Sequence, residues 1–111
     1  MKDDELLTLI YDLLYRLGLT ANYTGFFHTA YAVLLTCREP NRLRLATKLL
    51  YPEVADHYGT TWTAVERNIR YSIGLLWAEH PNRLSNLAGN PIAKRPTPAK
   101  FIALLSANLP T

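Results

Sequence analysis

The side chains of this sequence that are best suited to chemistry lie on a helical stretch near its middle. At about 100° per residue, one side of that helix is apolar over an arc of roughly 80°, formed by Val65, Ile69, Ile73 and Leu76. The opposite side carries a hydroxyl, two guanidiniums and an aromatic ring, from Thr63, Arg67, Arg70 and Tyr71, with Glu66 at the flank. Arginine pairs with guanine O6 and N7, glutamate accepts from cytosine N4, and threonine meets a phosphate or a thymine methyl. This side of the helix therefore has the groups that read DNA.

A solvated helix surface explains the same pattern equally well. Glu66 and Arg70 are four residues apart, and an i,i+4 ion pair is worth only about 0.2–0.5 kcal/mol. Periodicity and composition alone do not decide between a DNA-reading surface and a solvated one. The residues that position this helix give further evidence.

The residues before this helix have the spacing of a helix-turn-helix over about residues 52–79. Ala55 supplies a small residue where two steeply crossing helices touch, and Gly59 permits the positive φ that the tight turn requires. Val65 then returns an apolar side chain to the junction. Further packed side chains are expected at Val54 and Tyr58. For Trp62 both packing and a DNA contact are open, and packing is favoured. The pattern by itself is only moderately specific for DNA binding.

Helical spacing and capping signals place the whole chain in the all-α class, as a compact bundle of about six or seven helices. The expected helices cover about 3–17, 25–37, 41–50, 52–58 and 61–79, a short turn or helix at 84–87, and a last helix from 98, after a basic, proline-rich loop. The expected caps and stops are Asp3 or Asp4, Gly18, Thr24, Asn41, Gly59, Gly89 and Thr97. The expected core positions of the first, second and last helices are Leu6, Leu9, Ile10, Leu13, Leu17, Phe26, Phe27, Ala30, Val33, Leu34, Phe101, Leu105 and Leu109.

Composition predicts one globular domain over residues 1–111, because 49% of the residues are hydrophobic and only 19% are charged. Residues 17–37 lack charge but contain glycine, asparagine and histidine, which favours a buried helix over a membrane span. The net charge of +3 is a weak sign of an acidic partner. The sequence does not have the spacing of a metal site at its candidate ligands, which are His28, Cys37, His57 and His80. No catalytic or phosphate-binding arrangement is recognisable, so neither an enzyme nor a cofactor is expected.

Two runs of residues carry a family resemblance. Residues 48–55 read K-L-L-Y-P-E-V-A, residues 65–70 read V-E-R-N-I-R, and Thr60 and Thr61 stand between them. Together they resemble the C-terminal DNA-binding (effector) domain of the sporulation stage-zero A response regulator family. The likeness extends over nearly all of residues 6–109.

The resemblance implies a sequence-specific, double-stranded DNA-binding transcription regulator whose recognition helix enters the major groove. Its implied and expected base contacts are Thr63, Glu66 and Arg67, and its backbone contacts are Lys48, Thr60, Thr61, Arg70, Tyr71 and Arg95. Two copies would sit head to tail on adjacent DNA boxes, where they activate or repress transcription by RNA polymerase. Such a protein is expected in the cytoplasm, associated with the nucleoid and not with a membrane.

The sequence departs from the family in two ways, and the first of them opens an alternative function. Ala64 stands where the family usually places a base-reading arginine, and losing such a contact removes ~1–3 kcal/mol of discrimination. The length of 111 residues leaves no room for the family's phosphoacceptor receiver domain, which predicts a stand-alone DNA-binding protein or a competitor of the full-length regulator. The alternative is a protein-interaction module that pairs with a full-length regulator or RNA polymerase and binds DNA weakly or not at all.

Overall fold

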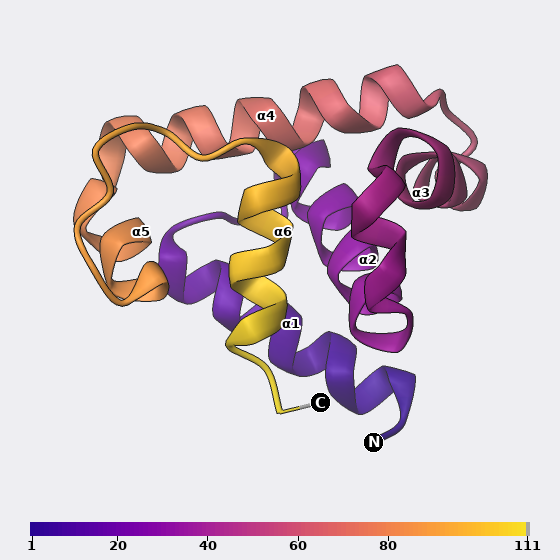
Figure 1. Ribbon diagram of the computed structural model, residues 1–111, viewed down its shortest axis with the longest axis horizontal. Helices are drawn as coiled ribbons and strands as arrows, with labels where there is room; N and C mark the ends of the chain where they lie inside the picture. The colour runs from indigo at the N-terminus through magenta and orange to yellow at the C-terminus, as the bar shows by residue number, and fades with distance from the viewer. Residues whose placement is uncertain (111) are drawn as a thin grey trace.

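A computed structural model describes residues 1–110, which form helices and, within that range, no β-strand (Figure 1). The α-helices are α1 (Asp3–Leu17), α2 (Thr24–Arg38), α3 (Tyr51–Tyr58), α4 (Trp62–Glu79), α5 (Pro81–Ala88) and α6 (Pro98–Ala107). A 3₁₀ helix, η1 (Pro40–Leu45), and a π helix, η2 (Ala46–Leu50), join α2 to α3. The predicted all-α class is confirmed. Thr111, the last residue of the predicted domain, lies outside the described residues.

Helix α2 lies at the centre of the bundle, where it contacts α1, α3, α4 and α6. This position explains why residues 17–37 carry no charge, and no helix of residues 1–110 is long and apolar enough to cross a membrane. Of the expected core positions of α2, four are buried: Phe26, Ala30, Val33 and Leu34. The prediction for Phe27 is wrong, because its ring is 37% exposed and packs edge-on against Tyr11 and Phe26 at the rim of the core.

Helix α1 buries the predicted side, at Leu6, Ile10, Leu13 and Leu17. Leu9 was expected there but is 36% exposed, and Leu14 is fully buried instead. The apolar stripe of α1 is therefore turned toward Leu14, because α2 covers that side. Gly18 ends the helix with a φ of 105°, as predicted.

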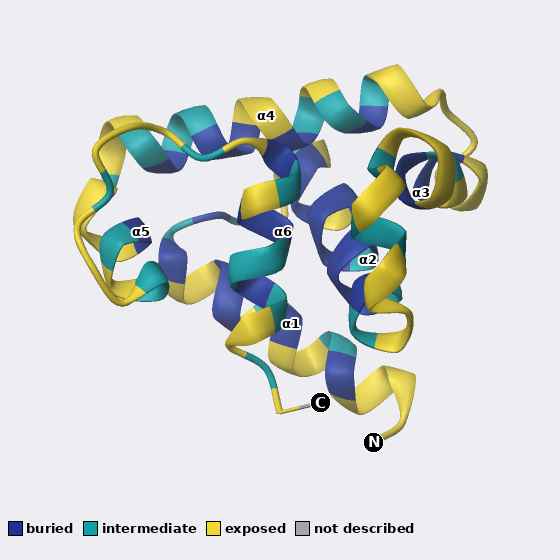
Figure 2. Ribbon diagram, in the orientation of Figure 1, coloured by how far each residue is buried: buried dark blue, intermediate teal, exposed yellow. Residues whose placement is uncertain are grey.

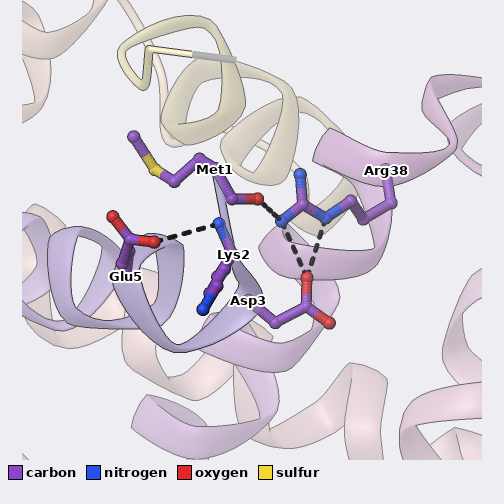
Figure 3. Close-up of polar contacts among 5 residues, drawn as sticks. All are labelled: Met1, Lys2, Asp3, Glu5 and Arg38. Atoms are coloured by element: carbon purple, nitrogen blue, oxygen red, sulfur yellow. Dashed lines mark hydrogen bonds and ion pairs between the residues drawn. The ribbon is translucent and has the colours of Figure 1, made fainter.

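An arginine ties the beginning of α1 to the end of α2 (Figure 3). Arg38 donates from Nε to Asp3 Oδ1 at 2.8 Å and from Nη2 to the Met1 carbonyl at 2.6 Å. Glu5 accepts from the backbone N–H of Lys2 at 3.3 Å. Neither Asp3 nor Asp4 is the N-cap, because helical geometry already begins at Asp3 and Lys2 is the residue before it. The prediction of an aspartate cap is wrong by one or two residues.

The segment before α3 is not the α-helix predicted over 41–50. It is 3₁₀ and then π helix, with Leu45 and Leu49 exposed, Leu50 buried, and Leu43 and Ala46 packed against the core. Arg42 donates from Nη1 to the Leu49 carbonyl at 2.6 Å. This bond provides a donor for a carbonyl in the irregular segment. A side chain from the same segment thus stabilises the departure from α-helical geometry.

The C-terminal third of the chain returns to the centre of the bundle. The short turn or helix predicted at 84–87 is a helix, α5, which begins earlier, at Pro81, and which Gly89 ends with a φ of 84°. The following loop runs back along α4 to the start of α6 (Figure 1). As predicted, Thr97 caps α6 and accepts from the Lys100 N–H at 3.3 Å. Phe101 and Leu105 are buried, and Leu109 packs against the core from beyond the helix end.

Candidate nucleic-acid interface

Helices α3 and α4 meet as the helix-turn-helix spacing predicts. Ala55 and Val65 are buried at their junction, and Gly59 has the left-handed conformation, with φ 66° and ψ 40°. The Thr60 N–H donates to the Ala55 carbonyl at 2.9 Å, which closes the end of α3. Tyr58 was expected to pack in the core, but it is not buried. It is 39% exposed, and its hydroxyl donates to the Phe27 carbonyl at 3.4 Å.

The threonines of the turn lie at the N-terminus of α4. Thr61 is the N-cap, and its Oγ1 accepts from the Ala64 N–H at 3.2 Å. The Oγ1 atoms of Thr61 and Thr63 are 3.1 Å apart, and both residues are exposed, as is Thr60. A helix N-terminus is the positive end of the helix dipole, so hydroxyls at this end lie where a phosphate is favoured.

Helix α4 has one buried side and one exposed side along its length (Figure 2). The predicted apolar stripe is buried at all four positions: Val65, Ile69, Ile73 and Leu76. All four side chains predicted on the other side are exposed: Thr63, Arg67, Arg70 and Tyr71. The sequence pattern therefore gave the correct orientation of the helix.

The loop before α6 brings a third guanidinium to this exposed side. Arg95 lies with Arg67, Arg70 and Tyr71 around a shallow hollow of about 470 Å³. Gly74 leaves room for this position of the guanidinium, because a Cβ there would be 2.8 Å from Arg95 Nη1 and the flexible arginine side chain would have to shift. Sequence reasoning did not single out Gly74, although a glycine inside a helix is a signal of close approach.

Glu66 and Arg70 form an ion pair on the same side of α4, with Glu66 Oε1 3.3 Å from Arg70 Nη2. The phenol of Tyr51, on α3, is buried beside this pair. Burial, and secondarily the charge of Glu66, raise the pKa of Tyr51 to about 12, whereas Arg70 opposes the shift. Tyr51 therefore stays a neutral phenol at ordinary pH, and Arg70 partly neutralises Glu66.

The remaining candidates lie away from this hollow. Lys48 is exposed on η2 and does not line it. His57 is exposed and stacks on Tyr31, with ring centroids 4.0 Å apart. Trp62 was expected to pack, but it is 41% exposed, so that expectation is wrong. Within residues 1–110, no three His, Cys, Asp or Glu side chains gather as a metal site would require.

One contact behind α4 was not foreseen. His28, on α2, is buried, and its Nδ1 lies 3.5 Å from Nδ2 of Asn68 on α4. Burial lowers the pKa of His28. The exposed side of α4 is thus backed by a neutral polar contact to the central helix, which no spacing in the sequence indicates.

Comparison with protein families accounts for this arrangement. The family model described as the C-terminal part of sporulation initiation factor Spo0A matches residues 10–109. The chain belongs to this family. Members of the Spo0A C-terminal family are DNA-binding domains of sporulation regulators and not enzymes, so this chain is a DNA-binding domain of transcription regulation. The matched range contains α3, α4 and the loop that carries Arg95.

Proposed function

We propose that residues 1–111 act as one domain that recognises a specific double-stranded DNA sequence, with α4 in the major groove. The observation that carries the proposal is the meeting of Arg67, Arg70 and Arg95 on the side of α4 that faces away from the core. Three guanidiniums line that hollow, and although Arg70 is paired with Glu66, Arg67 and Arg95 belong to no ion pair within residues 1–110, which favours a polyanion such as the DNA backbone.

The position of each side chain suggests its role. Arg67 is at the middle of the exposed side and Thr63 is one turn before it, so these two residues face the base edges, joined by Glu66 at the flank. Residues farther from that line would hold the sugar-phosphate backbone: Lys48, Thr60, Thr61, Arg70, Tyr71 and Arg95.

The decisive experiment is selection of bound sites from random duplex DNA, followed by fluorescence anisotropy on the selected site. Arg67→Ala removes the central guanidinium and leaves the core intact, so we expect affinity for the selected site to fall about 10- to 100-fold. Arg16→Ala is the matched control, because Arg16 is an exposed arginine on α1 that does not line the hollow around Arg67. Equal affinities of wild type and Arg67→Ala would contradict the proposal.

The rival function is a protein-interaction module with little affinity for DNA. Ala64 and the mutual neutralisation of Glu66 and Arg70 favour it, since both reduce what the exposed side offers to bases. Salt dependence separates the two functions. For a DNA-binding domain, log K falls with log salt concentration with a slope of about −0.9 for each phosphate contacted, whereas a flat response favours the rival.

We extend the proposal to the partners that the family resemblance suggests, namely a second copy bound head to tail and RNA polymerase. The first is tested by sedimentation with duplexes that carry one or two copies of the selected site. Two copies of the chain on the double site, with tighter binding than on the single site, would support it. Transcription from a template with this double site, with and without the protein, tests the second.

A further inference from the structure

A cavity of about 360 Å³ lies where the start of α2 meets the helix-turn-helix. Its lining comes from α2, α3, α4 and the segments that precede α2 and α4: Ala21, Asn22, Tyr23, Thr24, Phe27, His28, Tyr58, Thr60 and Asn68. None of these residues is an aspartate, a glutamate, a lysine or an arginine. Amide, hydroxyl and imidazole groups line it instead, so the cavity offers hydrogen-bond donors without a carboxylate that would repel an anion.

The first N–H groups of α2 are unpaired beside this cavity. The residue before the helix is Tyr23, not the Thr24 cap that the sequence predicted, and its side chain does not cap the helix. Within residues 1–110, no backbone carbonyl accepts from the N–H of Thr24 or Gly25, although Gly25 is buried. Buried N–H groups in proteins are almost always paired. The start of α2 therefore has free donors at the positive end of the helix dipole.

A buried imidazole provides a second, independent sign of a ligand. His28 lines the cavity but is only 3% exposed. The Asn68 amide nitrogen, which can only donate, lies 3.5 Å from His28 Nδ1, so a neutral ring carries its proton on Nε2. No hydrogen bond of Nε2 is found within residues 1–110, and Nε2 is not among the unpaired atoms that are sealed in the core. His28 thus keeps an unpaired donor that is accessible from the cavity.

The same side of α2 presents all of these donors. Thr24 and His28 are four residues apart on the helix, so they lie on one side of it. Side chains of a helix lean toward its N-terminus, which brings His28 toward the free N–H groups of the first turn. An anion at this end of α2 would therefore meet backbone and side-chain donors together.

The position of the cavity indicates where such an anion comes from. Thr60, on the turn, lines the cavity, and so does Tyr23, whose ring centroid is 6.3 Å from that of Tyr71 on α4. Thr60 and Tyr71 are both proposed contacts to the DNA backbone, so a duplex that touches both passes the cavity. Phosphate is the anion of that backbone, and helix N-termini bind phosphate readily.

We propose that this cavity holds one phosphate of the DNA backbone, which accepts from the first N–H groups of α2 and from the side chains of Thr24 and His28. The inference rests on the proposed function, because it requires a duplex against α4. The contact involves no base edge, so it adds affinity for any duplex, whereas Arg67 adds discrimination between duplexes.

A pair of substitutions at Thr24 tests the contact. Thr24→Asp places a carboxylate at the phosphate position, and Thr24→Asn has nearly the same shape without the charge. The helix dipole favours an aspartate in the first turn, so Thr24→Asp should melt no lower than Thr24→Asn. We nevertheless expect Thr24→Asp to bind the selected duplex and a scrambled duplex more weakly than Thr24→Asn by the same factor, about 10-fold.

Thr8→Asp is the matched control for net charge, because Thr8 is an exposed threonine on α1 that does not line the cavity. Equal DNA affinities of Thr24→Asp and Thr24→Asn, or a loss confined to the selected duplex, overturn this inference alone. Absence of any DNA binding by the wild-type chain overturns the proposed function and this inference with it.

Uncharged phosphate analogues identify the phosphate itself. A methylphosphonate, which replaces one charged oxygen by a methyl group, is placed at each position of the selected duplex in turn. We expect one position at which it weakens binding of wild type and of Thr8→Asp but not of Thr24→Asp, because that variant has already lost this phosphate. Equal losses for wild type and Thr24→Asp at every position overturn the inference.

Discussion

Substitution of Gly25 by alanine tests how closely the recognition helix must approach the central helix. Gly25 is buried in the first turn of α2, where α2 crosses α4. A Cβ at this position would overlap both Ser72 Oγ and the carbonyl oxygen of Asn68, at separations below the 3.0 Å that real Cβ atoms keep. The serine side chain can rotate away, but the carbonyl belongs to the backbone of α4 and can move only with the helix.

The size of the effect follows from this difference. Overpacking that forces backbone to shift costs about 1–3 kcal/mol, and the better helix propensity of alanine returns at most ~1 kcal/mol. We therefore expect Gly25→Ala to lower the free energy of unfolding, and to lower Tm by about 5–15 °C for a chain of this size. Because the displaced helix is α4, DNA affinity should fall as well.

Thermal unfolding followed by circular dichroism measures this effect, and Gly74→Ala provides the control. A Cβ on Gly74 meets only the end of the Arg95 side chain, at 2.8 Å, and that side chain is flexible and exposed. The same substitution should there raise the stability by up to about 1 kcal/mol. A melting temperature of Gly25→Ala at or above that of wild type would refute the argument that these helices are in backbone contact.

Two buried ionisable groups give predictions for the dependence of stability on pH. Burial lowers the pKa of His28 below its ordinary value of 6.5, so below pH 6.5 the unfolded chain binds a proton that the native chain binds less readily. Denaturant titrations should therefore show stability lost as pH falls through 6.5, and His28→Gln should remove that component. For Tyr51 the native pKa is about 12 against 10.0 in the unfolded chain, so the native phenol stays protonated longer. Stability should be level up to pH 10.0 and fall toward about pH 12, and a wild-type slope in Tyr51→Phe would contradict this assignment.

Elements with a strong local signal were predictable from the sequence. Gly59 indicated a left-handed turn, and the spacing of Val65 and Ile69 indicated which side of α4 faces the core. Both signals depend only on residues close in the sequence. The segment 41–50 was not predictable in the same way. Its hydrophobic spacing is helical, but its conformation depends on the bond from Arg42 to the Leu49 carbonyl, which forms only in the folded chain.

The candidate site also has a part that the sequence predicts and a part that it does not. Arg67, Arg70 and Tyr71 share an exposed side because they share a helix, and periodicity alone places them. The approach of Arg95 depends on the path of a loop, and only the family resemblance indicated it. Tyr58 and Trp62 were expected to pack but are 39% and 41% exposed. Hydrophobic spacing indicates which side of a helix is apolar, but not how much of each side chain the neighbouring elements cover.

The Glu66–Arg70 ion pair bears on the rate at which DNA associates. At a separation of 3.3 Å the two charges nearly cancel beyond the pair itself, so they add little to the field felt at ~8 Å, one Debye length in physiological salt. Arg67 and Arg95 belong to no ion pair within residues 1–110, and the long-range attraction from this side of α4 comes from them. Glu66 and Arg70 act only after contact, when a base edge or a phosphate can replace one partner of the pair. Arg67 and Arg95 would accordingly govern the association rate and its salt dependence, and the ion pair would govern how long the complex lasts.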